Sequence, residues 1–126
     1  MNSIKTKRIY DVPAKSDGYR ILVDRVWPRG VSKSKAALDE WNKNLAPSEG
    51  LRKWFNHDDK KFEAFSQRYQ RELLRVEDEL KRILELAKDQ QVCLVYGAKN
   101  KDFNQAVVLQ TVLTAKIHKE GYGPAL

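Results

Sequence analysis

The chain has 126 residues, of which 41% are hydrophobic and 33% are charged, a composition that predicts one globular domain over residues 1–126. No apolar run is long enough to span a membrane, and residues 1–10 lack the apolar segment of a secretory signal, so we expect a cytoplasmic protein. The net charge is +7, with eight Lys/Arg against three Asp/Glu in residues 1–33, and this basic excess favours anionic partners.

Three short segments predict β-strands. Residues 7–10 form a short candidate, residues 19–26 are apolar and β-branched at their centre, and residues 91–97 read as a buried strand. The second strand is expected to end at residues 27–30, because a proline there has no amide hydrogen to donate to a neighbouring strand.

Two short helices are expected between the second and third strands. Residues 34–45 predict a short helix or turn in which Leu38, Trp41 and Leu45 share one face. Residues 48–55 predict a second helix that begins with a serine N-cap.

A long helical pattern follows. Residues 58–89 repeat apolar side chains every three or four positions, which predicts one long amphipathic helix, or two helices with a bend near residues 75–78. Residues 98–103 are polar and predict a loop, and residues 104–119 predict the last helix, followed by a tail at 121–124. A strand, a helical crossover and a further strand form a parallel unit. We therefore predict a small three-layer α/β domain with a short, mainly parallel sheet flanked by helices.

The segment that follows the second strand is the first candidate site. Ligands of open α/β sheets bind beyond the carboxyl ends of the strands, and residues 24–30 fall there. Arg25 and Arg29 carry planar guanidinium groups suited to a carboxylate or a phosphate. Asp24 is placed to orient one of them and Trp27 to line a pocket, although structural ion pairs and packing of the turn explain the same residues.

The loop between the third strand and the last helix is the second candidate. Lys99 and the free amide groups at the helix start favour an anion cradle, with Tyr96 and Asn104 as neutral hydrogen-bonding groups. An ordinary strand-to-helix loop explains this pattern as well. If both strands are parallel, the two candidate segments lie at the same edge of the sheet.

The remaining reactive residue types, histidine and cysteine, give little evidence of a functional site. His57 is followed by Asp58, but a metal site needs three or more convergent ligands, and capping of a helix by Asp58 explains the pair better. Cys93 falls in a buried strand, where a thiol usually acts as a small apolar group. We assign no catalytic residue, no metal and no cofactor.

Several motifs resemble the YeaO-like branch of the domain-of-unknown-function 488 family. The most specific is Leu22–Gly30, and others are Asp17–Arg20, Asp39–Trp41, Ala46–Ser48, Leu51–Phe55 and His57–Asp58. The resemblance spans about residues 5–115 and implies a compact bacterial or archaeal cytosolic α/β domain without an assigned activity. The family pattern has an acidic residue where this chain has Asn100, and a histidine where it has Phe103.

Three functions remain open from the sequence. The leading one is binding of a small phosphate or carboxylate, with or without a reaction on it. The second is a nucleic-acid-associated or regulatory module, motivated by the basic excess in residues 1–33. The third is an interaction domain that dimerises through the long helix.

Overall fold

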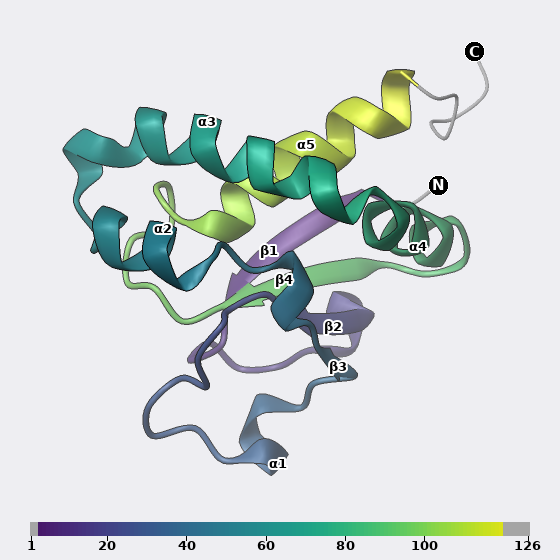
Figure 1. The fold of residues 1–126 in the computed structure, drawn as a ribbon. Helices are drawn as coiled ribbons and strands as arrows, with labels where there is room; N and C mark the ends of the chain where they lie inside the picture. The colour runs from purple at the N-terminus through teal and green to yellow at the C-terminus, as the bar shows by residue number, and fades with distance from the viewer. Residues whose placement is uncertain (1–2, 120–126) are drawn as a thin grey trace.

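The computed structural model describes residues 3–119 and places four parallel strands in one sheet. The strands are β1 (Ile4–Arg8), β2 (Tyr19–Leu22), β3 (Glu40–Trp41) and β4 (Val92–Tyr96), in the spatial order β1-β4-β2-β3 (Figure 1). All three neighbouring pairs are parallel. The predicted α/β class with a parallel sheet is confirmed.

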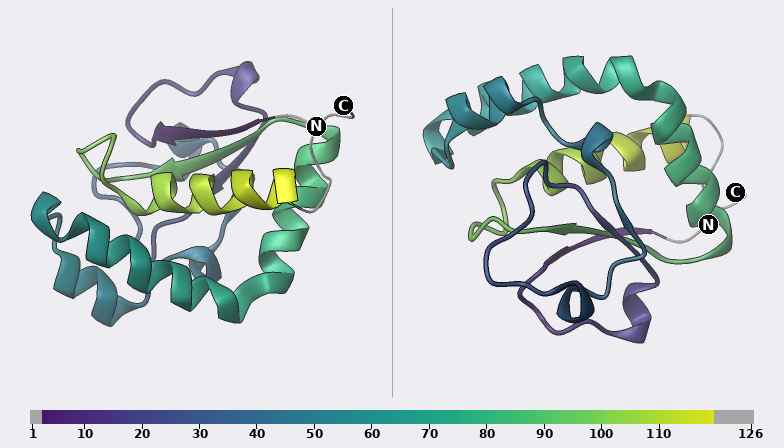
Figure 2. Two further views of the ribbon diagram at one scale, coloured as in Figure 1. Left: turned by 90° about the horizontal axis from the view of Figure 1, so that it is seen from above. Right: turned by 60° about the horizontal axis from the view of Figure 1, so that its bottom comes forward.

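The helices cover the two faces of the sheet unequally. On one face lie α2 (Glu49–Phe55), α3 (Phe62–Leu73), α4 (Glu77–Asp89) and α5 (Gln105–Lys119), with α5 packed directly on β1 and β4. Among residues 3–119, the opposite face carries α1 (Lys33–Ala36), a 3₁₀ turn at Lys15–Asp17 and connecting loops (Figures 1 and 2). The result is three layers, one of which is thin.

Alternation along the strands divides the apolar residues between the two faces. Ile21 and Leu94 belong to the core under the helices, whereas Leu22, Cys93 and Val95 belong to a smaller core on the opposite face. Strand β4 is buried along its whole length, which explains its uninterrupted apolar sequence. The predicted burial of Cys93 is confirmed, and burial raises the pKa of its thiol to about 11.

The predicted strands need three corrections. The first strand covers Ile4–Arg8 rather than residues 7–10, and Ile4 is its one apolar residue, so no apolar run marks it in the sequence. The second ends at Leu22, although the Val23 amide still donates to the Val95 carbonyl at 3.0 Å. A fourth strand, β3, has only two residues and was not predicted.

The single helix or turn predicted over residues 34–45 is wrong. After α1 the chain turns at Ala37, which has a φ of 48°, and enters β3. The Asp39 amide donates to the Arg20 carbonyl at 2.9 Å, which ties this segment to the sheet. Leu45 consequently packs under the helices and Leu38 on the opposite face, so the two do not share a helix face.

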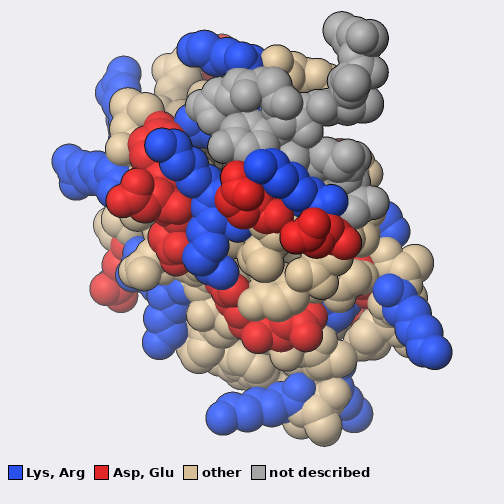
Figure 3. Space-filling model, turned by 90° about the vertical axis from the view of Figure 1, so that its right-hand side faces the viewer, with Lys and Arg blue, Asp and Glu red and all other residues tan. Residues whose placement is uncertain are grey.

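The long helical segment is two helices. A 3₁₀ turn over Leu74–Val76 separates α3 from α4, close to the expected bend. The apolar faces of both helices pack into the domain core through residues such as Tyr69 and Ile83. On the outer face of the molecule at α4, acidic and basic side chains are interspersed (Figure 3), as expected of a solvated surface. The described helices include none long and apolar enough to cross a membrane.

Of the two predicted helix caps, Ser48 caps its helix α2, whereas Asp58 caps the 3₁₀ turn Asp59–Lys61 and not α3 itself. Ser48 Oγ accepts a hydrogen bond from the Leu51 amide at 3.2 Å, and Asp58 Oδ1 accepts from the Lys60 amide at 3.0 Å, in the short turn before α3. Residues 121–124, predicted to be a tail, lie outside the described residues.

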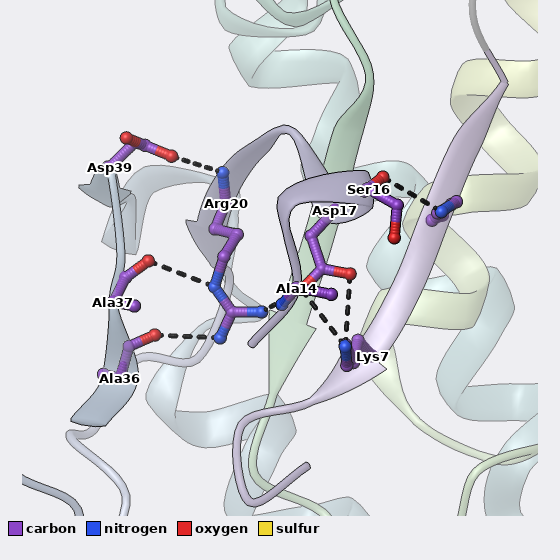
Figure 4. A network of polar contacts seen from close by, with 9 residues as sticks. Lys7, Ala14, Ser16, Asp17, Arg20, Ala36, Ala37 and Asp39 are labelled. Atoms are coloured by element: carbon purple, nitrogen blue, oxygen red, sulfur yellow. Dashed lines mark hydrogen bonds and ion pairs between the residues drawn. The ribbon is translucent and has the colours of Figure 1, made fainter. Parts of the chain in front are cut away.

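A buried ion pair fixes the thin layer to the sheet. Arg20 Nη1 lies 2.7 Å from Asp17 Oδ2, and both side chains are about 95% buried. The same guanidinium donates to the carbonyls of Ala36 and Ala37 at 2.8 and 3.1 Å, and Lys7 approaches Asp17 at 3.2 Å (Figure 4). This cluster therefore joins β1 and β2 to α1 and to the loops beneath the sheet.

Candidate functional site

A cavity of about 960 Å³ lies at the carboxyl ends of β2 and β4. Three segments contribute most of its lining: residues 24–28 after β2, residues 97–105 between β4 and α5, and residues 52–57 at the end of α2. The first two are the loops in which the sequence predicted a site, and they meet because their strands are neighbours and parallel.

The structure places most of the predicted site residues at the cavity and the others away from it. The cavity lining includes Asp24, Arg25, Trp27, Lys99 and Asn104. Arg29 is exposed and does not line the cavity. Tyr96 is buried in the core and reaches the site only through a hydrogen bond with the Asn104 side chain.

Arg25 is held by its inner nitrogen, which leaves its outer nitrogens for other partners. Its Nε donates to the Pro47 carbonyl at 2.8 Å. Within residues 3–119, neither terminal nitrogen has a hydrogen-bond or ion-pair partner, and the Lys99 ammonium has none either. Both cationic groups are thus available to a molecule in the cavity.

Asp24 is the one acidic residue among the described residues that line the cavity. Its Oδ2 accepts a hydrogen bond from the Gly97 amide at 2.9 Å, and its Oδ1 accepts one from Gln105 Nε2. Burial raises the pKa of this carboxyl to about 6, while the two hydrogen bonds and the positive charge of Arg52 act in the opposite direction. The sequence suggested that Asp24 orients an arginine, whereas in the structure it joins β2 to the start of α5.

Gly97 is needed for the close approach of Asp24. A Cβ added at Gly97 would lie 2.9 Å from Asp24 Oδ2 and 3.4 Å from the Pro28 ring. We expect Gly97→Ala to displace the carboxylate and lower the free energy of unfolding by about 1–3 kcal/mol, the usual cost of a lost buried hydrogen bond.

Urea unfolding at pH 7 tests the role of Gly97. The matched control is Gly50→Ala in α2, where an added Cβ meets nothing within 4 Å and alanine is the better helix former, so the control is expected to gain about 0.5–1 kcal/mol. Equal gains in both variants would contradict the close packing described for Asp24.

Helix α2 supplies the part of the site that the sequence analysis did not assign. Arg52 and Lys53, both exposed, and the turn residues Asn56 and His57 line the cavity opposite the strand-end loops. Asn56 and His57 have φ values of 45° and 57°, an unusual left-handed backbone in two successive residues other than glycine. The sequence feature that could have indicated this part of the site is the pair of family motifs at residues 51–55 and 57–58.

The lining combines positive charge with an apolar wall. Its described residues include four basic side chains, from Arg25, Arg52, Lys53 and Lys99, against the single carboxylate. Apolar surface comes from Trp27, Phe55, Phe65, Pro28 and Pro47. Such a mixture suits a small molecule that carries an anionic group.

Trp27 and Asn104 hold their segments in place. Trp27 Nε1 donates to the Val31 carbonyl at 2.7 Å, and its ring meets Trp41 edge-on with centroids 5.2 Å apart. Asn104 is buried, and its Oδ1 accepts from the Val107 amide at 3.1 Å, so it caps the start of α5.

The two departures from the family pattern have structural roles. Asn100 Oδ1 accepts from the amides of Asp102 and Phe103 at 2.9 and 3.0 Å, which shapes the loop before α5. The ring of Phe103 packs against Phe62 with centroids 5.0 Å apart. Neither residue offers a group for proton transfer. In the described part of the chain, no three His, Cys, Asp or Glu side chains are grouped to hold a metal ion.

These features define a small parallel α/β domain with a cationic cavity at the carboxyl edge of its sheet. A family model described as "Inactive DUF488-N3 subclade" matches residues 3–125, and the chain belongs to this subclade of the DUF488 family. "Uncharacterized protein YeaO" of Escherichia coli K12 is 49% identical over 107 residues, which cover 85% of this chain and 93% of that protein. The YeaO-like resemblance expected from the sequence is confirmed.

A more distant relative covers less of the chain. "Uncharacterized protein Rv3073c" of Mycobacterium tuberculosis H37Rv is 41% identical over 70 residues, which cover 56% of this chain and 59% of that protein. No solved structure matches the chain.

Proposed function

We propose that the cavity binds a small molecule through a phosphate or carboxylate group, and that this binding, rather than a reaction, is the function of the domain. The observation that carries the proposal is the pair of cations, Arg25 and Lys99, which face one cavity without protein partners among the described residues. Arg52 and Lys53 add positive charge from α2. A charge-assisted hydrogen bond contributes about 1.5–3 kcal/mol, so two or three such contacts support micromolar to millimolar binding.

A binding function also agrees with what the site lacks. Asn100 and Phe103 stand where the family pattern has an acidic residue and a histidine, and the subclade is described as inactive. Among the described lining residues, the cations outnumber the single carboxylate. The site is therefore better equipped to hold an anion than to exchange protons with it.

Isothermal titration calorimetry with inorganic phosphate and with citrate tests the proposal. In Tris chloride at low ionic strength and pH 7, at least one of the two is expected to bind. Arg25→Ala is expected to weaken the affinity by about tenfold or more, which corresponds to one lost charge-assisted contact.

Arg29→Ala is the matched control. It removes the same charge from a neighbouring residue that is exposed and does not line the cavity, so we expect an affinity within about twofold of the wild type. Equal losses in both variants would point to general charge attraction, and no binding of either probe would remove the proposed function.

A further inference from the structure

The negative charge of the Asp24 carboxylate is unexpected in a site that binds only anions. It lines the same cavity as Arg25 and Lys99, where its negative charge repels any anion that those cations attract. Asparagine could make two equivalent contacts with the Gln105 amide turned over, since its amide oxygen can accept from the Gly97 amide and its amide nitrogen can donate to Gln105 Oε1. The contacts within the protein therefore do not account for a charged group at this position.

The acceptor capacity of Asp24 is only partly used. An ionised carboxylate has about four lone-pair directions, and in the described residues Asp24 receives two hydrogen bonds, one on each oxygen. Its side chain is part of the cavity wall. A ligand that donates a hydrogen to Asp24 turns the repulsion into a strong hydrogen bond, whereas a ligand without such a donor meets only the repulsion.

We infer that Asp24 makes the cavity selective for oxyanions that still carry a hydroxyl hydrogen, namely phosphate or a phosphate monoester in its monoprotonated form, over fully deprotonated oxyanions. This inference rests on the proposed function and names its ligand class. Arg25 and Lys99 hold the charged oxygens, and Asp24 accepts the remaining hydrogen. Discrimination of this kind is typical of sites in which a buried acceptor would otherwise be left facing an anion.

Phosphate and sulfate provide the test, because both are tetrahedral anions of similar size and only phosphate retains a hydroxyl hydrogen at pH 7. By calorimetry at pH 7, the wild-type protein is expected to bind phosphate about tenfold or more tightly than sulfate. Asp24→Asn is expected to bring the two affinities within about threefold, mainly by improving the binding of sulfate.

The control is Asp78→Asn, which removes an exposed carboxylate of α4 that does not line the cavity and is expected to keep the wild-type preference. A purely structural role of Asp24 would change both affinities by the same factor and would overturn the inference. Equal binding of phosphate and sulfate by the wild type, or binding of citrate without phosphate, would also overturn it and leave the proposed function standing. Binding of none of the three probes would overturn both.

Discussion

Arg20→Met is expected to destabilise the domain by about 3–5 kcal/mol, the typical cost of removing one partner from a buried ion pair. The substitution leaves the Asp17 carboxylate in a buried position with Lys7 at 3.2 Å as its remaining cation. It also leaves the Ala36 and Ala37 carbonyls without the donors they have in the native domain. Since natural domains are stable by only about 5–15 kcal/mol, this loss is a large part of the total.

Chemical denaturation at pH 7 measures the effect of Arg20→Met, and Arg82→Met is the matched control. Arg82 pairs with Glu40 and Glu79, but its side chain is 41% exposed, so its loss is expected to cost about 1 kcal/mol or less. If the two variants unfolded at the same denaturant concentration, the buried network of Figure 4 would have no special part in stability.

Asp24→Asn is expected to have the opposite effect and to make the domain more stable at neutral pH. The pKa of Asp24 is about 6 in the folded protein against an ordinary 3.8, because burial disfavours its charged form. The folded state therefore binds the proton more tightly than the unfolded state, and this group's contribution to stability falls as the pH rises from about 4 to 6. At pH 7 the ionised carboxylate costs about 3 kcal/mol, at 1.36 kcal/mol for each pKa unit.

The difference between the variant and the wild type isolates this effect of Asp24. Burial raises and hydrogen bonds lower the pKa values of Asp17 and Glu40, with a net lowering, so these groups contribute stability that is lost as the pH falls. Their contribution is common to both proteins and cancels. Urea unfolding is expected to show Asp24→Asn about 2 kcal/mol more stable at pH 7, after allowing for weaker hydrogen bonds to a neutral amide. The gain should vanish near pH 4.

A gain that stayed constant from pH 4 to pH 7 would contradict the titration assigned to Asp24. Asp78→Asn provides the control curve, because Asp78 is exposed and lies outside the cavity lining. A variant that is more stable but less selective would show that the charge of Asp24 serves the ligand and not the fold.

The parts of the fold that depend on local sequence could be predicted. Strand β4 is apolar throughout and α5 begins at an asparagine cap, and both features are visible in the amino-acid pattern. Strand β3 could not be predicted, because its two residues are placed by contacts with β2, 19 residues earlier, through the Asp39 side chain and the Arg20 amide at 2.8 Å. A pattern read along one segment does not contain such a contact.

Part of the candidate site could likewise be predicted from the sequence, and part could not. Asp24, Arg25 and Lys99 follow neighbouring parallel strands, so their position at one edge follows from topology. The contribution of α2 depends on tertiary packing: Ser48 bonds to Glu72 through its amide and its hydroxyl, at 2.8 and 2.6 Å, and Phe55 stacks on Phe65. These contacts with α3 place Arg52 and His57 at the cavity. The contacts join residues that are distant in the sequence, so a local sequence pattern does not predict them.

The central place of β4 in the sheet has a consequence for how the domain assembles. Among the described strands, β1 pairs with β4 alone and β2 lies between β4 and β3, with Ile4 opposite Val92 and Ile21 opposite Leu94. A nascent chain emerging from the ribosome cannot complete this sheet until residue 96 has been made. Until then β1 lacks its partner strand and β2 can pair with β3 alone, and the long loop closures that bring β4 to them favour slow folding. The strand that ends at the cavity is thus also the last of the four to be synthesised, and the sheet is complete only when it is present.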